Sequence, residues 1–313
     1  MFTRKLGRSN ITVSALGLGC WAIGGPFWRG AHPVGWGEVD DAQSYAALAR
    51  ALEMGVTFFD TSDVYGCGHS ERILGQALQG KRDKVVIATK FGNIFDEQTR
   101  QITGFSGDPA FIRNACEASL RRLNTDHIDL YQFHIGDYDL EKAGEVVETL
   151  EGLVGEGKIR AYGWSTDDPE RAAIFAQGAH CAAIQQRLNL FEGNRAVLEC
   201  CEENNLASIN RGPLAMGLLT GKFSHESSLP ANDVRHGWDL QGGEQAKRLD
   251  RLAALRELLT SDGRTLAQAA LGWLWARSPV TIPIPGFKTI AQVEENVSAL
   301  ARGPLSAEQM AAI

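Results

Sequence analysis

Four residues of this chain carry side chains that together could reduce a carbonyl group or oxidise an alcohol. They are a carboxylate, a phenol, an ammonium and an imidazole: Asp60, Tyr65, Lys90 and His134. An ammonium about 4 Å from a phenol, at an effective dielectric of about 20, favours the phenolate by about 4 kcal/mol, and desolvation opposes this effect. Asp60 could hold Lys90 in place and keep it charged, while His134 could orient a carbonyl oxygen. The set would then act as a general acid in reduction or as a general base in oxidation.

The positions of these residues favour catalysis over the structural roles that each residue type has more often. Each of the four follows a short apolar run that we predict to be a strand, at residues 56–59, 85–89 and 128–133. Ordinary turn chemistry is the alternative, because Asp, Ser and Gly are common wherever a strand stops. Neighbouring parallel strands lie about 5 Å apart, so their carboxyl ends can bring such groups together.

The chain alternates predicted strands and helices along its whole length. Buried strands are predicted at residues 15–20, 56–59, 85–89, 128–133, 159–163, 182–185, 206–209 and 281–284, after a short hairpin within residues 2–13. A helix is expected from Asp40 and Asp41 to Met54, with an apolar face that includes Ala42, Tyr45, Ala49 and Leu52. Residues 223–243 form a polar loop that is a candidate lid or pocket wall.

Eight strands, with polar residues after many of them, favour a closed (β/α)8 TIM barrel. The prediction is one α/β domain, residues 1–313, with an N-terminal β-hairpin and extra C-terminal helices. A doubly wound sheet would alternate in the same way. However, the first strand ends in GLGCWAIGG, which lacks the G-x-G-x-x-G spacing of a dinucleotide-binding sheet.

Composition narrows the range of partners and compartments. The formal net charge is −7 with no basic run, which argues against nucleic acid or an anionic membrane as a partner. The six cysteines are scattered, without CxxC or metal-ligand spacing with His, so we expect no metal and a reducing, cytoplasmic compartment. The expected partner is a small carbonyl or sugar substrate, bound by a monomer or weak homo-oligomer.

Several motifs resemble the aldo-keto reductases, a (β/α)8 family that uses nicotinamide cofactors. They are DTSDVYGCGHSERILGQAL, ATKFG, DLYQFH, GWST and IPIPGFKTIAQVEENV, in that order. The resemblance runs from the first hairpin to the helix after the eighth strand. It implies that Asp60, Tyr65, Lys90 and His134 form the family's catalytic tetrad. It also implies hydride transfer between nicotinamide and a carbonyl carbon, with Tyr65 delivering the proton.

The resemblance also implies a set of cofactor-binding residues. Those expected near the nicotinamide are Gly19, Cys20, Trp21, Asp60, Ser165, Thr166, Gln185 and Arg211, and those expected near the adenosine are Gly286, Lys288, Thr289, Gln292, Glu295 and Asn296. Three positions depart from the family pattern, because Thr166 replaces an Asn, Leu188 an aromatic residue and Arg211 a stacking Tyr.

Lys288 and Thr289 stand at a predicted helix N-terminus, which favours a phosphate. We therefore expect NADPH or NADP⁺ rather than NAD(H). The alternative for Lys288 is a solvated side chain beside a capping box.

Two other functions remain open at this point. One is a regulatory, partner-binding subunit on the same fold, as channel-associated members of the family show. The other is a sugar or polyol dehydrogenase that works in the direction of oxidation, which uses the same chemistry. The intact tetrad favours an enzyme without excluding the first alternative.

Overall fold

The computed structural model describes residues 2–313, and its central feature is a parallel sheet of eight strands. The strands are β3 (Leu18–Gly19), β6 (Phe58–Asp60), β7 (Val86–Phe91), β10 (Ile128–Phe133), β11 (Ile159–Ser165), β12 (Cys181–Arg187), β13 (Ala207–Arg211) and β14 (Thr281–Pro283), and they are neighbours in chain order. Gly19 pairs in parallel with Gly286, and the Gly17 N–H donates to Pro283 O at 3.0 Å. These contacts join the first strand to the last, so the predicted closed barrel is confirmed.

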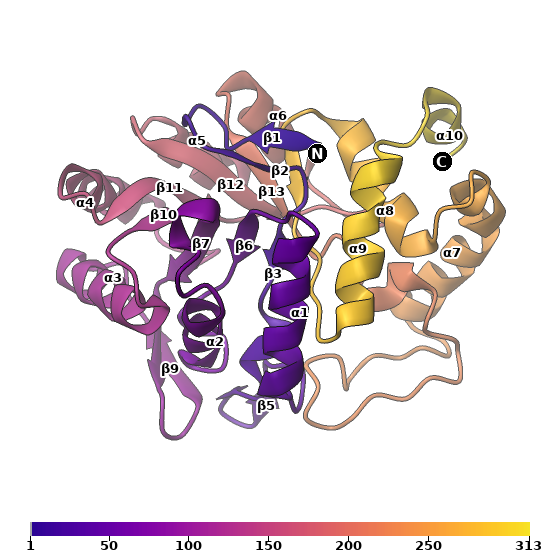
Figure 1. Cartoon of the computed structure of the whole chain (residues 1–313), viewed down its shortest axis with the longest axis horizontal. Helices are drawn as coiled ribbons and strands as arrows, with labels where there is room; N and C mark the ends of the chain where they lie inside the picture. The colour runs from indigo at the N-terminus through magenta and orange to yellow at the C-terminus, as the bar shows by residue number, and fades with distance from the viewer. Residues whose placement is uncertain (1) are drawn as a thin grey trace.

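Helices surround the barrel, as the alternating pattern predicts (Figure 1). They are α1 (Asp41–Glu53), α2 (His69–Ala77), α3 (Pro109–Leu123), α4 (Ala143–Gly155), α5 (Pro169–Ala176), α6 (Arg195–Glu203), α8 (Leu266–Arg277) and α9 (Ile290–Arg302), with α7 (Glu244–Thr260) and α10 (Ala307–Ala312) as additions. Short 3₁₀ turns are η1 (Ala22–Gly24), η2 (Arg82–Lys84), η3 (Leu140–Lys142) and η4 (Ala215–Thr220). Asp40, Asp108 and Asp168 cap α1, α3 and α5 by accepting backbone N–H groups.

The predicted inner face of α1 is wrong in part, because only Tyr45 and Leu52 of its four residues pack against the core. Ala42 and Ala49 are exposed, whereas Ser44, Ala47, Leu48 and Ala51 are buried against the barrel. Alanines occur on every side of this helix, so the apolar pattern does not define one face. The buried hydroxyl of Ser44 donates to Asp40 O at 3.0 Å, which removes the cost of burying it.

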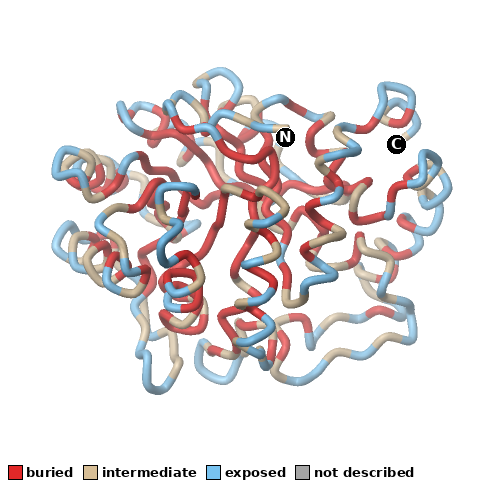
Figure 2. Tube along the Cα trace, in the orientation of Figure 1, coloured by how far each residue is buried: buried red, intermediate tan, exposed pale blue. Residues whose placement is uncertain are grey.

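Two apolar layers hold the fold together, and Figure 2 shows them as the red interior beneath an exposed outer surface of helices. The larger layer lies between strands and helices, and the smaller fills the barrel. The hairpin of β1 (Thr3–Lys5) and β2 (Thr12–Ser14) closes one end with Leu6. Gly7, at φ +53°, lies so close to the barrel that a Cβ there would be 2.2 Å from Ala182 O.

The opposite end of the barrel carries the long loops, which extend from the lower side of Figure 1. A second sheet forms there from β4 (Trp28–Arg29), β5 (His32–Pro33), β8 (Asn93–Asp96) and β9 (Gln101–Phe105), and the sequence analysis did not predict it. Residues 223–243 form the irregular loop that was expected. Its Val234 N–H donates to Gly35 O at 2.9 Å, and Asp233 pairs with Trp36, so the loop is joined to the segment after β5.

Among residues 2–313, no helix combines the length and the apolar character that crossing a bilayer would require.

Candidate active site

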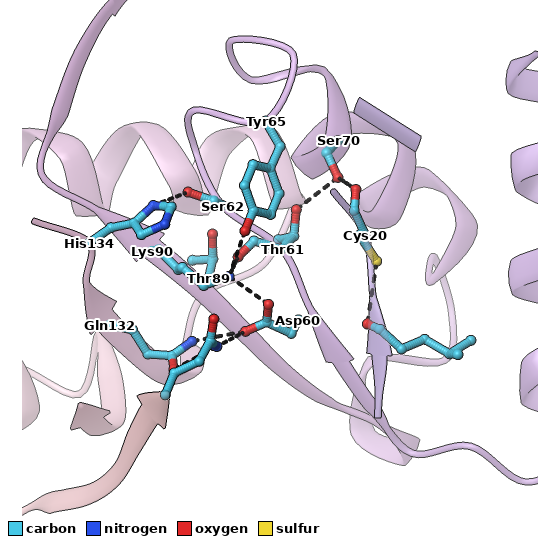
Figure 3. Close-up of polar contacts among 12 residues, drawn as sticks. Cys20, Asp60, Thr61, Ser62, Tyr65, Ser70, Thr89, Lys90, Gln132 and His134 are labelled. Atoms are coloured by element: carbon cyan, nitrogen blue, oxygen red, sulfur yellow. Dashed lines mark hydrogen bonds and ion pairs between the residues drawn. The ribbon is translucent and has the colours of Figure 1, made fainter. Parts of the chain in front are cut away.

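The predicted tetrad lies at the carboxyl ends of the strands, and Lys90 connects two of its members (Figure 3). Its Nζ donates to Asp60 Oδ1 at 2.5 Å, to Thr61 O at 2.8 Å and to Tyr65 Oη at 3.3 Å. The ring of His134 stands edge-on to that of Tyr65, with centroids 6.0 Å apart. Lys90 is completely buried, so the three side chains around it meet a charge that water does not screen. The structure therefore brings together the four residues that the sequence predicts.

Two amides hold the far oxygen of Asp60. Gln132 Nε2 donates to Asp60 Oδ2 at 3.0 Å and Gln185 Nε2 donates to the same oxygen at 2.8 Å. The two amides are also bonded to each other, at 3.1 Å. Asp60 is thus a fully satisfied carboxylate that fixes the position of the Lys90 ammonium. Part of the Gln185 side chain, expected to bind cofactor, is committed to this network.

A tight left-handed turn sets the position of Tyr65. Gly66, Cys67 and Gly68 all have positive φ, at 61°, 52° and 91°. Only glycine fits at position 66, because a Cβ there would lie 1.8 Å from Gly24 O. Trp21 stacks on the other side of the phenol ring, with centroids 5.8 Å apart. The GCG sequence after Tyr65 therefore forms the turn that orients the phenol toward the cavity.

The pKa of Tyr65 is not lowered, as a nearby ammonium alone would lower it. Burial raises the pKa of Tyr65, Lys90 lowers it, and the net result is a pKa above the ordinary value. Burial lowers the pKa of Lys90, but Asp60 and Tyr65 outweigh it and the pKa is raised. Burial first, then Lys90 and Arg211, place the pKa of His134 well below its usual range. At neutral pH the site therefore holds a protonated phenol, an ammonium and a neutral imidazole.

A cavity of about 1310 Å³ opens over the tetrad, which is more than one small metabolite needs. Most of the predicted site residues lie in its wall: Gly19, Trp21, Asp60, Tyr65, His134, Ser165, Gln185, Arg211, Gly286, Lys288, Gln292, Glu295 and Asn296. Lys90 lies beneath the wall and is hydrogen-bonded to Tyr65 and Asp60, which line it.

Three predicted cofactor residues do not bring their side chains into the cavity. Cys20 is buried in the core, with its Sγ 3.8 Å from Leu18 O. The Thr166 hydroxyl accepts from Asp168 N–H at 3.1 Å and so organises the loop before α5. The Thr289 hydroxyl caps α9. The cofactor-binding roles of these three residues stay predictions.

Lys288 is half-buried, and its side chain is bonded to the protein. Its ammonium donates to Trp36 O at 2.6 Å and to Glu38 O at 3.0 Å, which ties the start of α9 to the segment after β5. Burial lowers the pKa of Lys288. Arg211, in the position of the family's stacking Tyr, is ion-paired with Asp167 and lies near Tyr65.

The sequence analysis missed four cations in the cavity wall, which are Arg29, Arg187, Lys222 and Arg235. Arg235, in the long loop, makes a two-pronged ion pair with Asp233 and stacks over the Trp36 ring at 4.4 Å. Lys222 follows η4, and burial followed by the nearby Arg235 lowers the pKa of its ammonium. The position of Lys222 directly after LLTG could have indicated a site residue. The position of Arg235 in the wall depends on how the long loop folds back, which no local sequence pattern shows.

Within the part of the chain that the structure describes, no group of three or more His, Cys, Asp or Glu side chains could hold a metal ion.

A barrel with this tetrad at its carboxyl end defines an oxidoreductase acting on carbonyl or alcohol groups, and comparison with known proteins gives the family. The model of the aldo/keto reductase family matches residues 15–313, so the chain belongs to that family. It is similar to an NADP⁺ aldo-keto reductase of Schizosaccharomyces pombe, with 32% identity over 95% of this chain and 86% of that protein.

Solved structures give the same result. A glycerol dehydrogenase of Gluconobacter oxydans is similar, with 33% identity, a TM-score of 0.86 and coverage of 99% of this chain and 93% of that one. An aldo-keto reductase of Klebsiella pneumoniae in complex with NADPH is also similar, with 30% identity, a TM-score of 0.71 and coverage of 100% and 94%.

Proposed function

We propose that this chain catalyses the NADPH-dependent reduction of an aldehyde or ketone to the alcohol, with Tyr65 as the general acid. The observation that carries the proposal is the position of the buried Lys90, bonded to both the Asp60 carboxylate and the Tyr65 hydroxyl at the cavity wall. A phenol with a raised pKa keeps its proton at neutral pH, as an acid for reduction must. NADPH, when bound, supplies a hydride to the carbonyl carbon.

The residues of the chain supply the other half of the reaction. Tyr65 donates its proton to the carbonyl oxygen as that oxygen gains negative charge. Lys90 then stabilises the phenolate left behind, over the 3.3 Å that separates Nζ from Oη. His134 is neutral and can donate one N–H to the same oxygen, which orients the carbonyl. Trp21 and Phe27 in the cavity wall exclude water from this space.

The cavity fits a phosphate-bearing cofactor. Lys222, Arg235 and Lys288 influence one another electrostatically, and two carboxylates, Asp233 and Glu38, oppose them. This leaves a net positive charge in one region of the wall. The side chains of Arg235 and Lys288 are hydrogen-bonded to the protein. Lys222 has none of the ion pairs found in residues 2–313, so it is the cation best placed to bind a cofactor phosphate.

The backbone beside Lys222 supports the same interpretation. Ala215 and Met216 adopt left-handed conformations, with φ of 46° and 54°, although neither is glycine. Such strain is retained where a loop serves a ligand, and both residues line the cavity. Relatives that bind NADP(H) add support for this choice over NAD(H).

Oxidation of a sugar or polyol is the second candidate, and one observation favours it. The similar structure from Gluconobacter oxydans is a glycerol dehydrogenase. The same four side chains serve both directions, because the Tyr65 phenolate would accept the alcohol proton. Direction therefore depends on substrate and cofactor supply rather than on a different site.

The test is a panel of aldehydes, ketones and polyols, with NADPH or NADP⁺ consumption followed by absorbance. Tyr65→Phe is the matched control, because it removes one hydroxyl and keeps the ring on Trp21. Turnover that disappears in the control supports the proposal. Cofactor binding without turnover across the panel would overturn it in favour of a regulatory subunit on the same fold.

A further inference from the structure

The position of the single ring proton of His134 decides what this residue can do. A neutral imidazole has one N–H, on either Nδ1 or Nε2. Ser62 Oγ lies 3.2 Å from Nδ1, so Nε2 is the nitrogen left for the cavity (Figure 3). To donate to a carbonyl oxygen, His134 must carry its proton on Nε2. Nδ1 must then accept the proton of the Ser62 hydroxyl.

Ser62 touches a second group that competes for that proton. Its Oγ lies 3.2 Å from Asp63 Oδ1 as well as 3.2 Å from His134 Nδ1, and the hydroxyl is completely buried. One hydroxyl has one proton to donate. If Asp63 were ionised, it would take this proton, and His134 would have to donate from Nδ1 to Ser62 Oγ. If Asp63 carries its own proton, it donates to Ser62 Oγ and the hydroxyl is free to point at Nδ1.

The surroundings of Asp63 favour the protonated form. Two buried carboxyl groups, Asp63 and Glu71, lie near one guanidinium, that of Arg122. Glu71 takes the cation, because Arg122 Nε donates to Glu71 Oε2 at 2.7 Å and Thr89 Oγ1 donates to Glu71 Oε1 at 2.6 Å. Asp63 has no ion pair among those found in residues 2–313. Its burial, and then the charge of Glu71, raise the pKa of Asp63 to about 8, although Arg122 and hydrogen bonds from the Ser62 hydroxyl and the Val64 N–H oppose this.

We propose that Asp63, in its protonated form, acts through Ser62 as a positioning residue that keeps the His134 proton on Nε2. The chain of donors runs from Asp63 to Ser62 Oγ, and from Ser62 to His134 Nδ1, and it leaves Nε2–H for the substrate oxygen. Loss of the Asp63 proton reverses both hydrogen bonds and moves the His134 proton to Nδ1. The Nε2 lone pair then faces the substrate oxygen, where it repels instead of donating. The proposal rests on the proposed function only for the identity of that oxygen.

Other ionisable groups face these two residues. Around Asp63 they are Glu71 on α2, Arg122 on α3, Tyr131 on β10 and Cys67 in the adjoining turn; around His134 they are Lys90, Arg211, Arg29 and Tyr65. Burial holds the pKa values of Tyr131, Cys67 and Tyr65 above their ordinary values, and His134 stays neutral above its lowered pKa. Asp63 is therefore the group expected to change charge first as the pH rises from neutrality.

The direct test is ¹⁵N NMR of the histidine-labelled protein without substrate, from about pH 6 to about pH 10. The spectra distinguish a protonated ring nitrogen from an unprotonated one, and a His134→Asn variant assigns the signals. In the wild type we expect Nε2 to be protonated at the lower pH and the proton to move to Nδ1 as Asp63 ionises. In Asp63→Asn, whose amide NH2 can donate to Ser62 Oγ at every pH in this range, we expect the proton to stay on Nε2 throughout. Ser62→Ala removes the hydroxyl between Asp63 and His134, so the His134 signals of this variant should not change as Asp63 ionises.

Kinetics give an independent readout. The kcat for reduction in the wild type should fall by about 10²-fold on the alkaline side, because one donor to the oxygen is lost. Asp63→Asn and Ser62→Ala should lack this limb and keep only the later decline due to Tyr65. A wild-type His134 proton that stays on Nε2 over the whole range, or sits on Nδ1 at neutral pH, overturns the proposal. So does a pH-dependent exchange that persists in Asp63→Asn. Because NMR needs no turnover, failure of the proposed function would leave this result standing.

Discussion

Replacing Lys90 with Met tests whether the ammonium acts on the Tyr65 phenol. The separation of Nζ and Oη is 3.3 Å, and at an effective dielectric of about 20 the attraction of ammonium for phenolate is about 5 kcal/mol. If the transition state gained all of it, alcohol oxidation at neutral pH would fall by three to four powers of ten, about one for each 1.36 kcal/mol. We treat this as an upper limit, because water entering the vacated space would screen the phenolate.

The pH dependence of the same variant has a defined sign. Burial already raises the pKa of Tyr65, and Lys90 is the main group that lowers it. Without Lys90 the pKa must therefore rise further, not return to the ordinary value of a phenol. Since oxidation needs the phenolate, the kcat for oxidation should recover as pH increases and reach its plateau at a higher pH than in the wild type.

Folding needs its own control, because Lys90→Met also strips Asp60 of its cation. Breaking one partner of a buried pair costs about 3–5 kcal/mol, and Asp60 would keep only the amides of Gln132 and Gln185. The double variant Lys90→Met/Asp60→Asn removes the isolated charge and should regain stability in urea without regaining oxidation at neutral pH. A folded double variant with the wild-type pH profile of kcat would refute the role of Lys90.

Four further outcomes are expected. Tyr65→Phe should lose carbonyl reduction by at least about 10²-fold in kcat with little change in NADPH affinity, because its proton is needed only in the transition state; comparable loss of both would contradict this. Lys222→Met should weaken NADPH binding by roughly tenfold in fluorescence titration, and unchanged binding would remove Lys222 from the phosphate site. Since the pKa of Asp63 is raised on folding, the folded state binds more protons than the unfolded one, and stability should fall as pH rises from about 4 to 8. Asp63→Asn should flatten that slope in urea unfolding, and an unchanged slope would assign it to other groups. Chelation with EDTA should leave activity unchanged, and a loss restored by added metal would contradict the expectation of no metal.

The barrel was predictable because its signals are local and repeated. Apolar runs such as residues 128–133 gave β10 with its bounds, and Asp-Pro at 108–109 and 168–169 marked the starts of α3 and α5. The inner face of α1 was predicted only in part, because a helix rich in alanine has little amphipathic contrast. The sheet of β4, β5, β8 and β9 was missed for a different reason. It pairs segments about 70 residues apart, Trp28 with Gln101, through strands too short to show alternation.

The site divides in the same way. Motif spacing placed Asp60, Tyr65, Lys90 and His134, because each lies at or just beyond the carboxyl end of a strand. Motif spacing could not show whether burial or the charge of Lys90 has the larger effect on the pKa of Tyr65, since desolvation depends on the packed loop and on Trp21. Nor could it separate Thr166 from Ser165. The two are adjacent in GWST, yet the backbone turns so that Ser165 lines the cavity while Thr166 faces Asp168. The preference for NADPH and the roles of individual cofactor residues stay predictions.

Two aspartates three residues apart show how one strand end holds opposite charge states. Asp60 is buried beside an ammonium and two amide donors, so its negative charge is matched on both oxygens. Asp63 is equally buried, but the nearby guanidinium of Arg122 is bonded to Glu71, so a negative charge on Asp63 would have hydrogen bonds but no ion pair of its own. The neutral form of Asp63 is therefore the one of lower free energy. Environments that separate two carboxyl groups in this way assign one as a fixed charge and the other as a proton donor. Here the fixed charge holds Lys90 against Tyr65, and the proposed donor acts through Ser62 on His134. Both groups that would meet the substrate oxygen therefore depend on aspartates at the carboxyl end of β6.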